Sequence, residues 1–427
     1  MADARATWRR TSSSAMWTTL CENTSGRAGA RYGSSRSSTG SMIRPTSVGS
    51  PSGCREIMAV RATVVILGAG KATRLRPLSL QTPKPLVTVG NVTLLEIFGH
   101  LLHRADIAQA TVVLPAWFDE DLDREGLRAR TGVTFEARLS RPGIRGSLEA
   151  ALLGAPEGPE PLLVIYGDSL LSVDLAALLQ AHERTRAEGG VATLLLHRPA
   201  DLRQSEAAGR TYHGVLSVEA GGLVTKFVEK PLLEDIEADA WANAAVFLCE
   251  RQVVEEVAAA GGCDFSRDLF EKALATGRHR LYGTAIGGGF RIDLGTVERL
   301  LEANLRCVRG EIIVPGVAAE VAPGVRAPGD GFDRALLERI EPPVVLGPGV
   351  TIGPGSRLGP DVVLGAHAVL GEGVRVQRSL VGPGCLVGAG CRLDGVLLGE
   401  FSTLGPGSTL ARGTALGPFS RLGGAAE

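Results

Sequence analysis

The feature that most constrains the fold of this chain is a six-residue repeat in its C-terminal part. An aliphatic residue recurs at every sixth position and is usually followed by glycine, as in L-G-P-G-V-T and I-G-P-G-S-R. Such repeats form a parallel β-helix, in which each aliphatic side chain points into a triangular prism and three repeats complete one coil. The unbroken part of the repeat consists of Leu346, Ile352, Leu358, Leu364, Leu370 and Val376. We therefore predict a left-handed parallel β-helix over residues 342–427.

Two slips of one residue follow, and they keep the repeat regular. The repeat continues through Val381, Val387, Leu393, Leu398, Leu404, Leu410, Leu416 and Leu422. Its shortened units begin at Val376 and Leu393, one coil apart, so we expect these two residues to stack on the same face. Cys385 and Cys391 fall on different faces, and a disulfide requires Cα atoms within about 7 Å, so we expect no bridge between them.

The charge and cysteine content exclude several classes of function. The chain has 45 Lys+Arg and 46 Asp+Glu, a net charge of -1, so it has no global basic field for nucleic acid or an anionic membrane. It also lacks the run of about 18 to 20 apolar residues that a membrane span needs. The seven cysteines have no C-x-x-C spacing. Their odd number and scatter favour a reducing compartment, and we expect a cytoplasmic location.

The first 57 residues differ in composition from the rest of the chain. They are rich in arginine, serine, threonine and glycine, contain no lysine and show no apolar periodicity. Such a segment cannot bury enough apolar surface to offset its chain entropy. We therefore expect residues 1–57 to be disordered or to be a non-native extension, with translation beginning at Met58.

From Ala62 onwards, short apolar runs alternate with helical patterns. The runs T-V-V-I-L, A-T-V-V-L and L-L-V-I-Y, at 63–67, 110–114 and 162–166, have the character of strands buried on both faces. The sequence T-L-L-E at 93–96 predicts a capping box and a helix through His103. This alternation predicts an α/β domain with a Rossmann-like, mostly parallel sheet, whose ligands bind beyond the carboxyl ends of the strands.

Lysine is rare in this chain, and its positions point to a phosphate site. Four of the five lysines lie in two parts of the chain. Lys71 and Lys84 lie in L-G-A-G-K-A-T-R-L-R and the nearby T-P-K-P-L, and Lys226 and Lys230 lie in T-K-F-V-E-K-P. A glycine-rich turn after a strand, surrounded by cationic side chains, can hold phosphates. Lysine supplies a compact charge that arginine does not replace. The turn is not a dinucleotide fingerprint, because Thr73 takes the place of its third glycine.

Six motifs occur in a fixed order along the chain. They are L-G-A-G-K-A-T-R-L-R-P, T-P-K-P-L, Y-G-D-S-L, V-E-K-P, N-A-A-V-F and D-L-G-T. In this order the chain resembles the sugar nucleotidyltransferases (NDP-sugar pyrophosphorylases) over residues 62 to about 425. With the hexapeptide prism behind them, the motifs resemble most the mannose-1-phosphate guanylyltransferases. The resemblance implies a catalytic domain over 58–310 and a linker over 311–341 before the β-helix.

The same resemblance implies an activity and a set of site residues. The reaction would transfer a nucleotidyl group from an NTP to a hexose 1-phosphate, giving an NDP-sugar and pyrophosphate, with Mg²⁺ as cofactor. GTP and mannose 1-phosphate are the first expectation for substrates. The implied residues are Gly68, Ala69, Gly70 and Thr73 for the nucleotide, Arg74 and Lys84 for catalysis, Gly214, Glu229, Lys230 and Asn243 for the sugar 1-phosphate, and Asp168 and Asp293 for the metal.

Several alternatives stay open at this point. Asp168 could instead cap the following helix, and Asp293 could serve a turn before Gly295. Ala72 stands where the motif usually has glycine, which would crowd the backbone if that position needs a positive φ. Together with G-S-L-E at 146–149, which replaces a run of small residues, Ala72 leaves the choice of base in doubt.

Rival functions also remain. One is a uridylyl, thymidylyl or adenylyl transfer to glucose 1-phosphate. A second is a catalytically silent regulatory paralogue that binds nucleotide sugar. A third, an acyltransferase in the prism, rests on His367 alone, which is more simply a solvent-facing turn residue. The apolar prism also favours association, so we expect a homo-oligomer.

Overall fold

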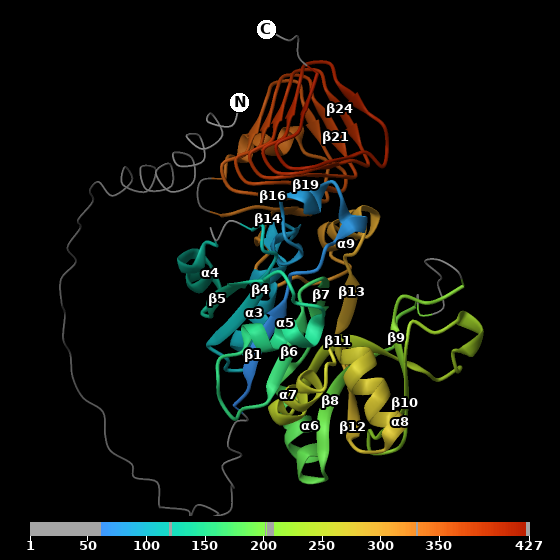
Figure 1. Ribbon diagram of the computed structural model, residues 1–427. Coiled ribbons are helices and arrows are strands. Elements are labelled where there is room, and N and C mark those ends of the chain that lie inside the picture. The colour runs from blue at the N-terminus through green and yellow to red at the C-terminus, as the bar shows by residue number, and fades with distance from the viewer. Residues whose placement is uncertain (1–60, 119–121, 201, 203–208, 330–331, 424–427) are drawn as a thin grey trace, which may run out of the picture. The chain divides into compact units, whose positions relative to one another are not determined.

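The structure is a computed structural model that describes residues 61–118, 122–200, 202, 209–329 and 332–423 (Figure 1). All of these residues belong to one unit, Ala59–Glu427. The predictions for residues 1–57 and for a start at Met58 fall outside the described residues. None of the described helices is long and apolar enough to cross a membrane.

A nine-stranded sheet forms the centre of the first domain, and its parallel half is built as the sequence predicts. β1 lies between β6 and β4, and β5 follows β4, with all three pairings parallel. Val65 and Ile66 of β1 have no exposed surface, as expected of a strand covered on both faces. The bounds are β1 (Thr63–Leu67), β4 (Gln109–Leu114), β5 (Thr134–Leu139) and β6 (Leu162–Tyr166). The Rossmann-like prediction is confirmed.

The other half of the sheet is largely antiparallel. β11 pairs antiparallel with β6, β8 and β9, and β10 pairs antiparallel with β9, while β12 is parallel to β8. A separate antiparallel ribbon joins β7 to β13. The bounds are β7 (Ser169–Ser172), β8 (Gly190–His197), β9 (Gly214–Val218), β10 (Val224–Glu229), β11 (Trp241–Cys249), β12 (Arg280–Ala285) and β13 (Phe290–Asp293). Apart from the β8–β12 pair, the parallel pairings therefore occupy one half of a mixed sheet.

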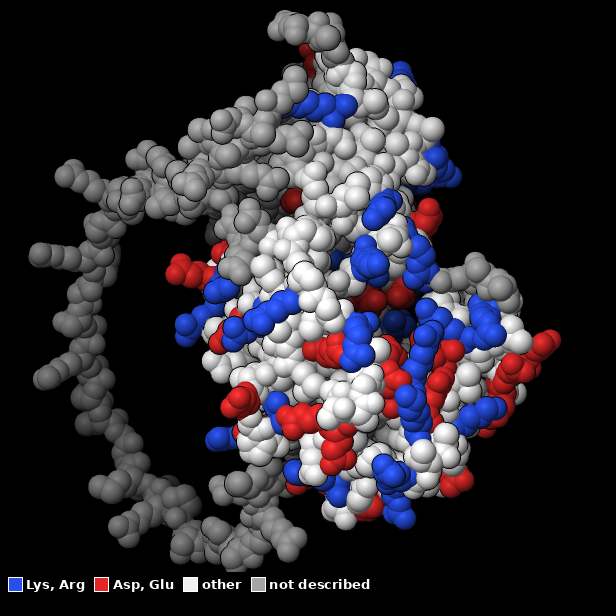
Figure 2. Space-filling model, viewed as in Figure 1, with Lys and Arg blue, Asp and Glu red and all other residues white. Residues whose placement is uncertain are grey.

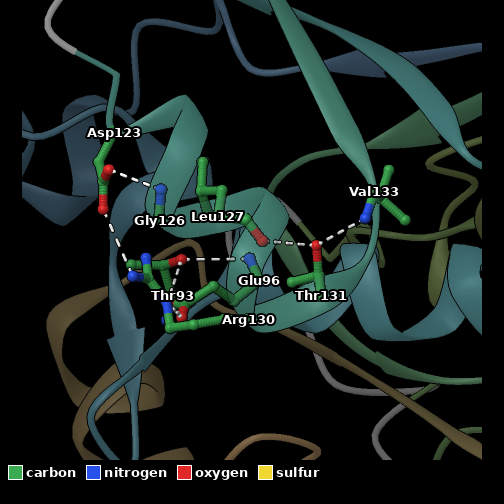
Figure 3. A network of polar contacts seen from close by, with 8 residues as sticks. All are labelled: Thr93, Glu96, Asp123, Gly126, Leu127, Arg130, Thr131 and Val133. Carbon is green, nitrogen blue, oxygen red and sulfur yellow. Dashed lines mark hydrogen bonds and ion pairs between the residues drawn. The ribbon is translucent and has the colours of Figure 1, made fainter.

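Helices connect and cover these strands. α3 begins with the predicted capping box, in which Thr93 Oγ1 accepts from Glu96 N (3.1 Å) and Thr93 N donates to Glu96 Oε2 (3.1 Å). Arg130 of α4 reaches Glu96 and also pairs with Asp123 (3.3 Å), so the two helices are tied together (Figure 3). The bounds are α3 (Leu94–Arg104), α4 (Arg124–Thr131), α5 (Ser147–Gly154), α6 (Leu175–Ala187), α7 (Arg251–Ala259), α8 (Lys272–Thr276) and α9 (Val297–Val308).

Shorter elements complete this domain. The segment Phe265–Glu271 (η5) is a π-helix that runs directly into α8, and Asp264 caps its N-terminus by accepting from Arg267 N (3.2 Å). Asp264 is therefore a helix-start residue. The remaining elements are η1 (Thr73–Leu75), η2 (Leu78–Leu80), η3 (Lys84–Leu86), η4 (Leu233–Asp235), β2 (Thr88–Val89) and β3 (Val92–Thr93).

The C-terminal part is the predicted left-handed parallel β-helix, which Figure 1 shows as a stack of short strands. Its aliphatic columns coincide with the repeat: Leu346 pairs with Leu364, Leu364 with Val381 and Val381 with Leu398. Val376 pairs with Leu393, so the two slips stack on one face. Cys385 and Cys391 are buried free thiols, as expected.

The strands of the prism are short and form three parallel sheets. They are β16 (Val344–Leu346), β17 (Thr351–Ile352), β18 (Arg357–Leu358), β19 (Val362–Leu364), β20 (Val369–Leu370), β21 (Arg375–Gln377), β22 (Ser379–Val381), β23 (Leu386–Val387), β24 (Arg392–Asp394), β25 (Leu397–Leu398), β26 (Thr403–Leu404), β27 (Thr409–Leu410), β28 (Ala415–Leu416) and β29 (Arg421–Leu422).

The segment predicted as a linker carries structure of its own. Within 311–341, β14 (Glu320–Ala322) and β15 (Val325–Arg326) form a hairpin, which extends a prism sheet because β15 pairs with β16. A short helix, η6 (Arg334–Arg339), follows. The domain boundaries themselves stay predictions.

The prism and the α/β domain share one hydrophobic core. Leu78 and Val87 of the α/β domain belong to the same cluster of buried residues as Leu380 and Leu397 of the prism. Asn91 Nδ2 donates to the Leu364 carbonyl (3.0 Å). The prism therefore supports the segment that carries the T-P-K-P motif.

Candidate active site

The candidate site begins where two neighbouring parallel strands end. Gly68 follows β1 and Gly167 follows β6, and Gly167 N donates to the Leu67 carbonyl (2.9 Å). Gly68 N donates to the Val113 carbonyl (2.8 Å). A Cβ on Gly68 or on Gly167 would clash with the ring of Pro85, so both glycines allow the T-P-K-P segment to lie against the strand ends.

The glycine-rich turn presents its outer side to solvent. Gly70 is exposed, and a Cβ there would have no atom within 4 Å among the described residues. Ala69 is half-buried, and Thr73 is exposed at the start of η1. These three residues, predicted for the nucleotide together with Gly68, therefore lie at one accessible turn, where backbone N–H groups can face an anion.

Ala72 has the conformation that the missing glycine would favour. Its φ is 45° and its ψ is 38°, in the left-handed region. Ser79 Oγ donates to the Ala72 carbonyl (2.7 Å) and so supports this conformation. The sequence-based concern about a positive φ at this position is confirmed, because an L-residue with a Cβ is strained there.

Lys84 meets Asp168 beside this turn. Lys84 Nζ lies 3.6 Å from Asp168 Oδ2, and the two side chains are 13% and 31% exposed. Asp168 does not cap the following helix, because Asp174 accepts from Ala177 N (3.0 Å) in that role. The structure thus brings together a predicted catalytic residue and a predicted metal ligand.

Asp293 is placed next to Asp168 by the β7–β13 ribbon. Asp293 pairs with Ser169, and Leu294 N donates to the Asp168 carbonyl (3.1 Å). Asp293 Oδ1 accepts from Gly295 N (2.9 Å), so this residue also serves the predicted turn. A Cβ on Gly295 would lie 3.2 Å from Arg74 Nη2, which places the Arg74 guanidinium against the same turn.

Two arginines that the sequence analysis did not single out flank Asp293. Arg299 Nη1 donates to Asp293 Oδ1 (3.1 Å), and Arg291 Nη2 lies 3.7 Å from Asp293 Oδ2. Burial alone would raise the pKa of Asp293. Arg291, Lys84, the Gly295 N–H and Arg299 outweigh that effect, so the pKa of Asp293 lies below its ordinary value.

The two aspartates fit a magnesium ion that also uses substrate oxygens. Mg²⁺ is commonly held by one or two carboxylates, substrate phosphates and retained waters. The described residues contain no cluster of three or more His, Cys, Asp or Glu side chains suited to hold a metal by themselves. Asp168 and Asp293 on adjoining segments match the arrangement that depends on substrate.

The predicted sugar residues lie on the antiparallel half of the sheet. Gly214 pairs with Glu229 across β9 and β10, and a Cβ on Gly214 would lie 2.8 Å from Glu229 Oε2, so glycine leaves the carboxylate its space. β11 pairs with β9 through Trp241 and Ala242, which places Asn243 at the same end of the neighbouring strand as Gly214.

The charges in this region are unusual. Burial raises the pKa of Glu229, against the opposing effects of a hydrogen bond from Ser266 and of the nearby Lys230. Lys230 is exposed and has a φ of 54°, and its N–H donates to the His213 carbonyl (3.1 Å). Backbone strain at non-glycine residues often occurs at functional sites.

Comparison with known proteins agrees with this arrangement. A family model described as nucleotidyl transferase matches residues 63–309. The chain belongs to this nucleotidyl transferase family. A second model, described as the GMPPB C-terminal domain, matches residues 340–421, which cover most of the prism.

Individual relatives are 26% to 30% identical to the chain over the residues that align. A mannose-1-phosphate guanylyltransferase of Mycobacterium tuberculosis is 30% identical over 275 residues, covering 62% of this chain and 70% of the relative. A UTP–glucose-1-phosphate uridylyltransferase of Synechocystis is 27% identical over 281 residues, covering 61% and 67%. A mannose-1-phosphate guanylyltransferase catalytic subunit beta of Drosophila pseudoobscura pseudoobscura is 26% identical, covering 45% and 49%.

Proposed function

We propose that this chain transfers a guanylyl group from GTP to mannose 1-phosphate. A phosphate oxygen of mannose 1-phosphate attacks the α-phosphorus of GTP and forms a new P–O bond. The bond from the α-phosphorus to the oxygen that bridges to the β-phosphate breaks, and pyrophosphate leaves with its electron pair. The products are GDP-mannose and pyrophosphate, and no further reactant is needed.

The observation that carries this proposal is the gathering of four charged side chains at one strand edge. Lys84 lies beside Asp168, and Arg74 lies against the turn that contains Asp293. Phosphoryl transfer requires positioning of the phosphates and stabilisation of their charge more than covalent help from the protein. Arg74 would hold the triphosphate and Lys84 would contact the reacting phosphate.

The remaining roles follow from position. Gly68, Ala69, Gly70 and Thr73 would face the nucleotide, while Gly214, Glu229, Lys230 and Asn243 would hold the mannose and its phosphate. Asp168 and Asp293 would hold Mg²⁺, which when bound neutralises phosphate charge. In the free protein Lys84, Arg291 and Arg299 balance the charge of these carboxylates.

The choice of GTP and mannose 1-phosphate is supported by both parts of the chain. The prism matches the GMPPB C-terminal domain, and two of the three relatives named above are mannose-1-phosphate guanylyltransferases. The uridylyltransferase of Synechocystis supports UTP and glucose 1-phosphate as the second candidate pair.

The experiment is pyrophosphate release with Mg²⁺ over a grid of NTPs and hexose 1-phosphates. The expected result is highest kcat/KM for GTP with mannose 1-phosphate, abolished by Lys84→Ala and Asp168→Asn. A higher value for UTP with glucose 1-phosphate would replace the substrate assignment. Silence across the grid from folded protein that binds GDP-mannose would favour the regulatory paralogue instead.

We also propose a homo-oligomer in a reducing, cytoplasmic setting. Phe401 and Phe419 stack on each other (ring centroids 5.3 Å apart) although each is more than half exposed, and this exposed aromatic pair is the surface on which we place the contact with a second copy. The five described cysteines are all free thiols, which suits a reducing compartment.

A further inference from the structure

Arg291 lies between the two halves of the candidate site. It is two residues before Asp293 on β13, and side chains two apart on a strand point to the same face. Its Nη2 lies 3.7 Å from Asp293 Oδ2, and its Nη1 donates to His213 Nδ1 (3.5 Å). His213 directly precedes Gly214 of the sugar region. Arg291 therefore joins the predicted metal carboxylate to the predicted sugar pocket.

The Arg291 side chain is a buried cation that can donate a further hydrogen bond. It is 9% exposed, and within the described part of the chain its Nε has no hydrogen-bond partner. A buried N–H without an acceptor costs free energy, so such a group indicates a missing partner or ligand. Neither of its present contacts is short, and both leave room for a stronger acceptor.

A second arginine, Arg299, contacts the same aspartate as Arg291. Arg299 donates to the other Asp293 oxygen, and its guanidinium carbon lies 4.0 Å from the centre of the Tyr212 ring. Tyr212 in turn packs on His213, with ring centroids 4.1 Å apart. Stacking of this kind holds a guanidinium in place without using its N–H groups. Figure 2 shows a hollow with basic and acidic side chains around it, between the positions that β13 and β9 occupy in Figure 1.

We propose that Arg291, supported by Arg299, binds the phosphate of the sugar 1-phosphate. This inference rests on the proposed function. With the sugar against Gly214 and Glu229 and the reacting phosphates at Asp168 and Asp293, the phosphate that connects them must cross the place where Arg291 lies. A guanidinium is suited to a phosphate because its N–H groups match the spacing of two phosphate oxygens. Arg74, on the side of the glycine-rich turn, is left to the triphosphate.

The test compares Arg291→Met and Arg291→Lys with a matched buried arginine. Arg251 is the control, because its side chain is 8% exposed and its Nε donates to the Glu160 carbonyl (3.3 Å), away from the site. In Arg291→Met, KM for mannose 1-phosphate is expected to rise about tenfold to a hundredfold, while KM for GTP changes by less than about threefold. Arg291→Lys recovers part of the loss, and Arg251→Met changes neither KM.

A binding measurement separates this role from turnover. In GDP-mannose the phosphate next to the sugar derives from the sugar 1-phosphate, whereas GMP lacks it. Arg291→Met is expected to weaken binding of GDP-mannose about tenfold or more and to leave GMP binding within about threefold. Equal losses for both ligands, an equal rise of both KM values, or no change in KM for mannose 1-phosphate would overturn the role of Arg291.

Measurements on the wild-type chain decide whether the proposed substrates are correct. If another sugar 1-phosphate and NTP are preferred, the same comparison uses that pair, its NDP-sugar and the corresponding nucleoside monophosphate. The substrate assignment then falls, while Arg291 is judged by the same ratio of KM values. A folded wild-type chain that binds no sugar 1-phosphate and no NDP-sugar overturns both proposals.

Discussion

Lys84 Nζ lies 3.6 Å from Asp168 Oδ2, so the ammonium of the T-P-K-P motif meets a carboxylate that follows the strand next to β1. The contact is long for an ion pair, and Lys84 is also close enough to Asp293 to lower the pKa of that carboxyl. One ammonium therefore interacts with both carboxylates. A guanidinium is planar and larger, so an arginine at this position would meet the two carboxylates in a different geometry.

Replacing Lys84 by arginine is therefore expected to impair the reaction although the charge is kept. We expect kcat for pyrophosphate release to fall by about a hundredfold or more in Lys84→Arg, in the range found when one charge-stabilising donor is lost. Lys272→Arg is the matched control, since Lys272 forms a surface pair with Asp268 (2.7 Å). Normal turnover by Lys84→Arg would show that any cation suffices at this position.

The left-handed backbone of Ala72 predicts a stabilising substitution. Ala72→Gly removes the clash of the Cβ and is expected to raise the free energy of unfolding by about 1 kcal/mol, measured by urea denaturation. Ala69 is in the same turn but has no positive φ. Ala69→Gly should therefore have the opposite sign, because glycine only adds freedom to the unfolded chain there. A loss of stability in both variants would refute the strain at Ala72.

Glu229 predicts a pH-dependent stability with a definite sign. Its pKa is raised in the folded protein by burial, so its contribution to stability is present at acid pH and is lost as the pH rises through that raised value. Glu229→Gln should therefore be more thermally stable than the wild type at neutral pH, and the difference should vanish below about pH 4.

The same substitution is expected to lower kcat/KM for mannose 1-phosphate by about tenfold to a hundredfold, because a charged acceptor is lost. Glu219→Gln, at an exposed carboxylate, is the control for both measurements. A melting temperature of Glu229→Gln below that of the wild type at pH 7 would contradict the assignment of an unfavourable buried charge.

The shared core predicts that the two domains unfold together. Leu397 is 1% exposed and belongs to the core that also contains Leu78 and Val87. Leu397→Ala should lower the free energy of unfolding by about 2 to 5 kcal/mol within a single calorimetric transition. Leu386→Ala, on the outer face of the same prism where Leu386 is 49% exposed, should change it little. Two separate transitions would show that the domains are independent.

Removing one of the stacked phenylalanines is expected to weaken the assembly. Phe419→Ser is expected to shift the oligomer toward smaller species in light scattering at micromolar concentration, because an apolar contact surface is lost. Trp117→Ser, at another exposed aromatic residue, should leave the distribution unchanged. An identical mass for Phe419→Ser and wild type would remove this surface from the interface.

The prism could be predicted almost residue by residue, whereas half of the central sheet could not. A six-residue period has one geometric solution, so even the one-residue slips at Val376 and Leu393 followed from spacing. Strands β1, β4 and β6 followed from apolar runs buried on both faces. The antiparallel pairings of β9, β10 and β11 depend on contacts between distant segments, and their half-buried sequences carry no comparable signal.

The candidate site shows the same contrast. The lysines of the motifs stand out because only five occur in the chain, while Arg291 and Arg299 are two arginines among 40 and carry no signal of their own. One clue was present: Arg291 lies two residues before Asp293, and on a strand that spacing places both on one face. The contact with His213 depends on the tertiary fold and could not be read from the sequence.

The spacing of the prism columns limits how this chain can change in length during evolution. Leu346 to Leu364 is 18 residues (364 − 346), and Leu364 to Val381 is 17 (381 − 364). Both coils keep their aliphatic columns in register, so a change of length is accommodated in a turn, whereas an extra residue within a strand would turn the aliphatic side chains that follow it in that strand out of the interior. Natural variants should therefore differ in length at the turns of the prism or by whole coils, and keep the length of its strands.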